Sequence, residues 1–323
     1  MFRSESIVVL ALAMACSAGP DRVGSPIQRF VARAAGRVEV LDWGGRGTAL
    51  LFLPGLGNTA HVYAEFAPRF RHRYRVLALT PRGFGESTPN DRGAPLDTVL
   101  ADIAAVLDTL RLGKVVLVGH SLGGDVATSF AVAFPNRVTA LIYLEGANDR
   151  RPGAQPPPNA PWPAPPAMTR DDSASAPAYQ RYVERTFGPR LPLQDIRATT
   201  AFDSAGRFAG GRPPDSVVAV LVGSIAPPPY RQVTVPALAI YSEPDPSRYD
   251  LPYWNRLSGA DARAADSLQA WLVRSAKTNE DSVQAMLRSL EVVRIPRSGH
   301  LIFLLSPDAA ERAMRRFLDH VAP

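Results

Sequence analysis

The chain of 323 residues is nearly free of cysteine and of lysine. With Cys16 as the one cysteine, an intramolecular disulfide is impossible, and cysteine usage says nothing further about the redox compartment. Two of the 36 basic residues are lysines, Lys114 and Lys277. The arginines are spread along the whole chain, and the densest cluster, Arg69 to Arg75, is short. The net charge of +6 is therefore typical of genome composition, and we expect no nucleic-acid partner.

Long hydrophobic runs are also missing. The longest, Ile7 to Ala15, is too short to span a bilayer, and Arg3 precedes it with positive charge. The pair of small residues in Ala13-Met14-Ala15 is followed at once by Cys16, a pattern that resembles a bacterial lipoprotein signal. Plain secretion or a start codon placed too early stay open as alternatives. We expect residues 1–26 to be a signal segment and linker, the protein to be exported from the bacterial cytoplasm, and any membrane attachment to run through lipidated Cys16.

Metal-ligand spacing is absent as well. His72 and His320 cluster with no cysteines or acids at the sequence spacing of metal ligands. His61 is expected on a helix surface, although it could line a pocket. We therefore expect no metal and no cofactor. What the chain does have is 46% hydrophobic and 20% charged residues, a composition typical of a globular enzyme. The length allows a full core with room for an insertion.

From Ile27 onward, segments of strand and helix pattern alternate. Leu96 to Leu110 carries apolar residues at helical spacing, and a helix is expected to start near Asn58. The strands are near-continuous apolar runs, which predicts a mostly parallel sheet with helices on both faces, an α/β fold. The predicted strands are Gln28–Arg33, Arg37–Trp43, Thr48–Leu53, Tyr74–Leu79, Lys114–Val118, Val138–Leu144, Pro236–Tyr241 and Glu291–Ile295, and a last helix is predicted over Pro307–Val321.

The alternation breaks over residues 147–232. This stretch is dense in proline, shows no clear strand, and repeats aromatic residues such as Trp162 and Phe187. A disordered linker is one interpretation. We favour an inserted lid or cap, because the strand pattern resumes afterwards. The predicted division is therefore a core of residues 27–146 and 233–323 with a lid over 147–232, and a second, helical insertion over Tyr253 to Leu290.

Gly119-His120-Ser121-Leu122-Gly123 lies between the strand that ends at Val118 and the following helix. A G-x-S-x-G in that setting is typical of a nucleophile elbow, which holds a serine hydroxyl exposed on a strained turn. Far downstream, Ser298-Gly299-His300 follows the last predicted strand. Serine needs a base to take its proton, and imidazole titrates in the right range for that work.

These segments resemble the α/β-hydrolase-fold serine hydrolases of the esterase and lipase branch over roughly residues 27–323, excluding the two insertions. Leu53 to Asn58 is similar to the family's H-G-x segment, with Pro54 in place of histidine. Arg82 to Ser87 is similar to its R-G-x-G-x-S turn, and Ile240 to Asp245 to the segment that ends in the catalytic acid. The resemblance implies a triad in the order serine, acid, histidine.

The resemblance assigns Ser121 as nucleophile, His300 as base and Asp245 as the acid that orients His300. The backbone N–H groups of Leu56 and Leu122 are expected to form the oxyanion hole. For the acid, three alternatives stay open: Glu243, two residues before Asp245, and Glu145 and Asp149, which follow another predicted strand. His120 is expected to support the elbow.

The implied activity is cleavage of a carboxylic ester or thioester through an acyl-serine, on a small substrate with an apolar acyl part. Serine at the elbow argues against epoxide hydrolases and haloalkane dehalogenases, which carry aspartate there. Hydrolysis of a carbon–carbon or amide bond, or acyl transfer, would use the same triad. A non-catalytic ligand-binding protein on this fold is the remaining class, and the complete triad argues against it.

Overall fold

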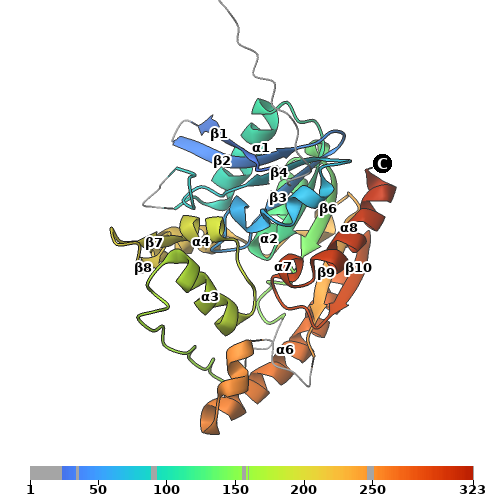
Figure 1. The fold of residues 1–323 in the computed structure, drawn as a ribbon. Coiled ribbons are helices and arrows are strands. Elements are labelled where there is room, and N and C mark those ends of the chain that lie inside the picture. Colours follow the sequence, from blue (N-terminus) through green and yellow to red (C-terminus); the bar gives the residue numbers. More distant parts are fainter. Residues whose placement is uncertain are drawn as a thin grey trace, which may run out of the picture.

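The computed structural model describes residues 24–33, 36–88, 93–154, 158, 160–245 and 251–322. Most of the predicted signal segment, with Cys16, lies outside these ranges. An eight-stranded sheet in the order β1-β2-β4-β3-β5-β6-β9-β10 forms the centre of the molecule (Figure 1). β1 (Ile27–Arg33) pairs antiparallel with β2 (Gly36–Gly44), which pairs antiparallel with β4 (Arg75–Leu79). All the other pairs are parallel, as predicted.

The predicted strands agree with the observed ones to within a few residues, and the apolar runs of the central strands are almost fully buried. The remaining strands are β3 (Ala49–Leu53), β5 (Val115–His120), β6 (Val138–Leu144), β9 (Ala237–Glu243) and β10 (Leu290–Pro296). The helix expected near Asn58 is instead two short 3₁₀ turns, η1 (Ala60–Tyr63) and η2 (Ala67–Phe70). A third 3₁₀ turn, η3 (Pro135–Arg137), precedes β6.

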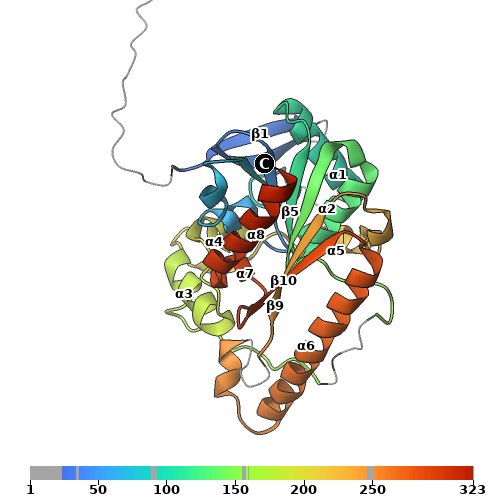
Figure 2. The same ribbon diagram turned by 90° about the vertical axis from the view of Figure 1, so that its right-hand side faces the viewer.

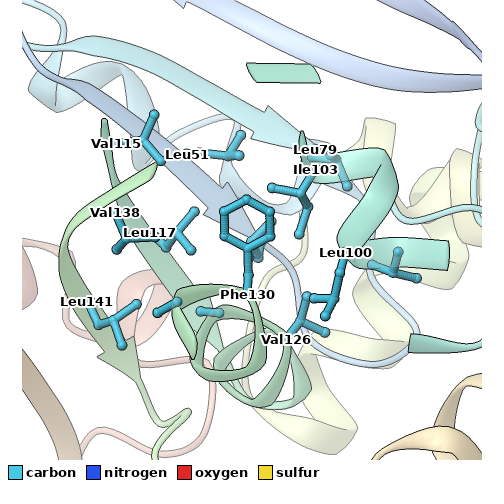
Figure 3. Packing of buried hydrophobic residues seen from close by; sticks show 14 of the residues in the cluster. Leu51, Leu79, Leu100, Ile103, Val115, Leu117, Val126, Phe130, Val138 and Leu141 are labelled. Atoms are coloured by element: carbon cyan, nitrogen blue, oxygen red, sulfur yellow. The ribbon is translucent and has the colours of Figure 1, made fainter. Parts of the chain in front are cut away.

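Helices cover both faces of the sheet. On one face, α1 (Leu96–Thr109) and α2 (Leu122–Ala133) bury Ile103, Val126 and Phe130 against alternate residues of β3, β4, β5 and β6 (Figure 3). On the other face lie η1, η2, α7 (Ile302–Leu305) and α8 (Pro307–Val321). Strands buried in this way leave their carboxyl ends as the place where polar side chains can gather.

The inserted segment contains more regular structure than its sequence predicts. It forms α3 (Ala176–Phe187), α4 (Leu193–Thr199), a small hairpin of β7 (Thr200–Phe202) and β8 (Phe208–Gly211), α5 (Asp215–Ser224) and η4 (Tyr230–Gln232). α3, α4 and the hairpin lie together beside the sheet (Figure 1). α5 and η4 instead join the core, since Leu221 and Tyr230 are buried in the cluster under α1 and α2.

The second predicted insertion is helical, as expected: η5 (Pro252–Arg256) leads into the 28-residue α6 (Gly259–Met286), which reaches well away from the sheet (Figure 2). Its beginning packs against the first insertion. The Tyr253 hydroxyl donates to the Pro163 carbonyl at 2.7 Å, and the Trp254 and Trp162 rings lie 5.6 Å apart. The two insertions therefore meet in one structural unit, called the lid below (residues 160–211 and 251–272). Within the described ranges, no helix has the length and apolar character needed to cross a bilayer.

Candidate active site

Ser121 lies on a strained turn between β5 and α2. Its φ of 48° and ψ of −122° put a non-glycine residue in a sparsely populated region of backbone conformation. Neighbouring chain segments approach too closely for side chains. A Cβ on Gly123 would lie 2.3 Å from the Leu53 carbonyl oxygen, and one on Gly124 would lie 2.0 Å from that of Gly146. These contacts explain why glycine occupies positions 123 and 124, and they hold Ser121 in its strained conformation.

His300 lies in the loop after β10 and lines the same cavity as Ser121, a polar space of about 500 Å³. Its side chain is 59% exposed. The preceding Gly299 has a φ of 95°, and its N–H donates to the Ser242 hydroxyl at 2.6 Å. The end of β9 therefore holds the loop that presents His300, and the structure brings together the serine and the histidine that the sequence selected.

The acid beside His300 is Glu145, one of the alternatives left open by the sequence. Its Oε2 lies 3.6 Å from His300 Nδ1, and among the described residues it is the carboxylate within 4 Å of that ring. Glu145 follows β6 with a φ of 51°, and its N–H donates to the Ile240 carbonyl of β9 at 3.0 Å. Its other oxygen, Oε1, accepts the N–H of Ser242. The carboxylate beside His300 thus follows the strand next to the predicted one.

Asp245 was predicted for this position and does not occupy it. It lies two residues beyond β9, and its backbone carbonyl accepts a hydrogen bond at 3.0 Å from Gln269 Nε2 on α6. β9 contributes Ser242, whose N–H and hydroxyl bind Glu145 and Gly299. Asp149, another of the alternatives, is bound by the Arg151 guanidinium, which lowers its pKa below the usual range.

His120 is buried next to Ser121 and contacts two neighbouring loops. Burial, together with repulsion from His300, lowers the pKa of His120 to about 3, so the ring is neutral at physiological pH. Its Nε2 lies 3.0 Å from the His300 carbonyl oxygen. A neutral ring that carries its proton on Nε2 would donate there. On its other side, a Cβ on Gly55 would lie 2.7 Å from His120 Nδ1. The ring therefore bridges the Gly55 loop and the histidine loop.

The predicted oxyanion donors lie on two segments that contact each other, a turn and the start of α2. Leu122 is the first residue of α2, and Leu56 lies in the turn closed by the hydrogen bond from Asn58 N–H to the Gly55 carbonyl at 3.2 Å. Both line one small apolar cleft. Among the described residues, neither N–H has a recorded acceptor in the protein. A Cβ on Gly55 would lie 3.1 Å from Ser121 Cβ, so this turn packs directly against the elbow.

The lid is bound to the Leu56 turn through a buried carboxylate, which the sequence analysis missed. Asp195 on α4 is fully buried. It accepts hydrogen bonds from Asn58 Nδ2 at 2.9 Å, from the Thr59 N–H at 3.0 Å and from the Thr59 hydroxyl at 2.7 Å. Burial raises the pKa of Asp195 above its ordinary value. Because 136 positions separate Asp195 from Thr59, no local pattern could have indicated this contact.

Two further cavities meet the polar one at His300. One, of about 290 Å³, is apolar and contains the aromatic residues expected of the lid, with Trp162, Phe187 and Leu305 in its wall. The other, of about 510 Å³, lies between the ends of β9 and β10 and helix α6, next to Glu145. His300 therefore lies where an apolar and a polar space converge.

The other histidines take no part in this arrangement. His61 Nε2 lies 3.1 Å from the buried Glu39 carboxylate, which also accepts the Thr80 hydroxyl at 2.6 Å. His320 Nδ1 lies 2.7 Å from the Arg316 carbonyl oxygen at the surface, and His72 is exposed. Within the described ranges, no group of three or more histidine, cysteine or acidic side chains could hold a metal ion.

A strained serine, a histidine in the same cavity and a carboxylate behind it, at the carboxyl ends of a mostly parallel sheet, define a hydrolase of the α/β class. The family model described as alpha/beta hydrolase fold matches residues 48–307. The chain belongs to this family.

The similarity to individual members of the family is low or covers only part of the chain. The chain is 25% identical over 280 residues to the 2-(acetamidomethylene)succinate hydrolase of Mesorhizobium japonicum, and the match covers 85% of this chain and 89% of that protein. It is 34% identical over 127 residues to the sn-1-specific diacylglycerol lipase ABHD11 of Danio rerio, over 39% of this chain. The matches to that lipase and to epoxide hydrolase 4 of Mus musculus span 40% and 31% of those proteins.

Solved structures support the same fold. The crystal structure of E-2-(acetamidomethylene)succinate hydrolase has a TM-score of 0.66 at 20% identity, covering 91% of this chain and 99% of that one. A thermophilic esterase from Thermogutta terrifontis has a TM-score of 0.60 at 19% identity, covering 93% and 100%. At such identities the likeness shows the fold alone.

Proposed function

We propose that this protein is a serine hydrolase that cleaves a carboxylic ester or thioester through an acyl-serine intermediate, with Ser121, His300 and Glu145 as its triad. The observation that carries the proposal is the strained backbone of Ser121 in a cavity shared with His300, whose Nδ1 lies 3.6 Å from Glu145. Glu145 replaces Asp245 in the role of the acid, because it has the contact that the role requires.

In the proposed reaction, His300 takes the hydroxyl proton of Ser121 as the oxygen attacks the substrate carbonyl. The carboxylate of Glu145 orients the imidazole and stabilises the imidazolium that forms. The N–H groups of Leu56 and Leu122 bind the oxyanion, and loss of one such donor typically costs ~3 kcal/mol of transition-state stabilisation. His300 then protonates the leaving group, and water releases the acyl group by the same steps.

The apolar cavity bounded by Trp162 and Phe187 supports an apolar acyl part in the substrate. The cavity reaches His300, and its volume of about 290 Å³ suits an acyl chain of moderate length. The ester or thioester class therefore suits the site, with a small molecule as substrate.

A fluorophosphonate probe tests the nucleophile. The wild type should be labelled stoichiometrically, and Ser121→Ala should abolish labelling. His300→Ala should slow labelling by several orders of magnitude. His72→Ala is the control, since His72 is exposed and remote from the cavities described above. Unchanged labelling of the Ser121→Ala protein would exclude the proposed mechanism.

A pair of isosteric variants tests the acid. Glu145→Gln should lower turnover of a p-nitrophenyl ester by roughly 10⁴-fold, because the amide cannot stabilise the imidazolium. Asp245→Asn should change turnover little. A large loss in Asp245→Asn with normal turnover in Glu145→Gln would return the role to Asp245.

A second candidate is hydrolysis of an amide or carbon–carbon bond on the same triad. It is favoured by similarity to the 2-(acetamidomethylene)succinate hydrolase over 85% of the chain. It is also favoured by 36% identity over 115 residues to a 2-hydroxy-6-oxononadienedioate/2-hydroxy-6-oxononatrienedioate hydrolase of Burkholderia vietnamiensis. Turnover of matched ester and amide substrates by the wild type and by Ser121→Ala separates the two candidates.

A further inference from the structure

The polar cavity that contains Ser121 and His300 has an arginine at its wall that neither the triad nor the oxyanion hole uses. Asn148, Asp149, Arg150 and Arg151 complete its lining. The Nε and Nη2 groups of Arg151 bind the Asp149 carboxylate at 2.9 and 2.7 Å, so these two charges neutralise each other. Arg150 is the other arginine at this wall, and the acid that it contacts, Asp125, lies behind it.

Arg150 is held in place from behind. Its Nε donates to Oδ2 of Asp125, a fully buried residue on the elbow helix α2, and the Arg150 side chain is 39% exposed. Oδ1 of Asp125 is buried without a hydrogen-bond partner in the described protein. Within the described ranges, the two terminal nitrogens of Arg150 donate to no protein group. The hydrogen bond from Nε to Asp125 thus orients the guanidinium, and the two terminal nitrogens are left to bind a ligand.

The backbone around Arg150 is also well anchored. The Asn148 N–H donates to the Tyr230 hydroxyl at 2.8 Å, and the Asp149 N–H donates to Asn279 Oδ1 at 2.8 Å. These bonds attach the loop to the core and to α6. A guanidinium on a fixed loop loses little freedom on binding, and its planar pair of N–H donors matches the two oxygens of a carboxylate.

Resting on the proposed hydrolysis at Ser121, we propose that Arg150 binds a carboxylate in the leaving-group part of the substrate. The apolar and polar cavities share only His300 among their lining residues. With the acyl chain in the apolar cavity, the group on the other side of the scissile bond faces Arg150. The favoured substrate is therefore an apolar acyl ester of an alcohol or phenol that carries a carboxylate.

Two butyrate esters test this proposal: 4-(butyryloxy)benzoate, whose leaving group carries a carboxylate, and methyl 4-(butyryloxy)benzoate, whose leaving group is neutral. In both compounds the bond to be cleaved is the butyryl ester. The measured quantity is kcat/KM for the carboxylate divided by kcat/KM for the methyl ester. The difference in intrinsic reactivity between the two esters is the same for every variant and cancels when ratios are compared. In Arg150→Gln the ratio should fall about 10- to 100-fold from its wild-type value, the range expected for lost hydrogen bonds to a charged group.

Controls separate binding from folding. The double variant Asp149→Asn/Arg151→Gln removes both members of the neutralised ion pair from the same cavity, and should keep the ratio within about threefold of the wild type. Arg150→Lys keeps the charge without the planar pair of donors, and should restore part of the ratio. If Arg150→Gln folds poorly beside the buried Asp125, the double variant Asp125→Asn/Arg150→Gln takes its place.

An equal ratio in the wild type and in the folded Arg150 variants, with both esters turned over, would overturn this inference and leave the serine mechanism intact. Absence of turnover together with absence of probe labelling would instead refute the proposed function. Free 4-hydroxybenzoate should inhibit butyrate release from the neutral compound. Weaker inhibition in Arg150→Gln would support the carboxylate site without turnover of a charged substrate.

Discussion

Removal of the Asp195 carboxylate should damage stability and catalysis together, since this group connects the lid to the Leu56 turn. Asp195→Ala leaves three donors without acceptors: the buried Thr59 N–H and Thr59 hydroxyl, and Nδ2 of the half-buried Asn58. At ~1–2 kcal/mol for each orphaned donor the loss is ~3–6 kcal/mol. Relief from burying a carboxylate offsets ~1–2 kcal/mol of it. The free energy of unfolding should fall by a net ~1–5 kcal/mol.

The catalytic effect follows from the position of the turn. Thr59 lies three residues after Leu56, so a loosened turn misplaces the proposed oxyanion donor. The upper limit is loss of that donor, ~3 kcal/mol or a factor of 10² to 10³ in kcat. KM should change much less, because the lid cavities keep their lining. Asp195→Asn keeps an acceptor for Thr59, and its new amide can pair with a flipped Asn58 side chain, so most of the stability and turnover should return.

Urea denaturation and steady-state kinetics on a p-nitrophenyl ester measure the two effects. Asp172→Ala is the control, because Asp172 is a buried lid carboxylate whose partners, Arg185 and Thr169, lie inside the lid. It should lower stability without lowering kcat of the folded protein. If Asp172→Ala and Asp195→Ala lower kcat equally, or if Asp195→Asn is as damaging as Asp195→Ala, the proposed connection to the oxyanion turn is wrong.

Two other predictions concern the lid and a buried acid. For p-nitrophenyl esters, kcat/KM should rise with acyl length, by a factor equivalent to about 0.8 kcal/mol per methylene, until the apolar cavity is full. Trp162→Ala or Phe187→Ala should flatten that rise and leave hydrolysis of acetyl esters nearly unchanged. A flat profile in the wild type would contradict the acyl pocket. Burial raises the pKa of Asp125 to about 7, so the folded state binds its proton more tightly than the unfolded state, and this acid's contribution to stability should decline as pH rises from about 4 to about 7. Urea midpoints of wild type and Asp125→Asn across that range check it, and parallel profiles would show that Asp125 does not titrate there.

Much of this protein could be predicted from its sequence because the signals are local. Apolar runs at strand length and apolar residues at helical spacing predicted the strands and α1 close to their observed positions. A strand buried on two faces leaves a continuous apolar run in the sequence, and a helix buried along one stripe leaves apolar residues at helical spacing. The elbow could be predicted for the same reason. The strain at Ser121 and the close contacts around it require glycine at neighbouring positions of the chain.

The tertiary structure decided what depends on distant segments. Glu145 and Asp245 both follow apolar strands, and sequence spacing cannot say which carboxylate reaches His300. The pairing of β6 with β9 and the left-handed turn at Glu145 select the former. Asp195 with Thr59, and Asp125 with Arg150, are likewise contacts between segments far apart in sequence. A buried carboxylate is stable only where folding brings donors to it from other elements, and that requirement leaves no periodic pattern in the chain itself.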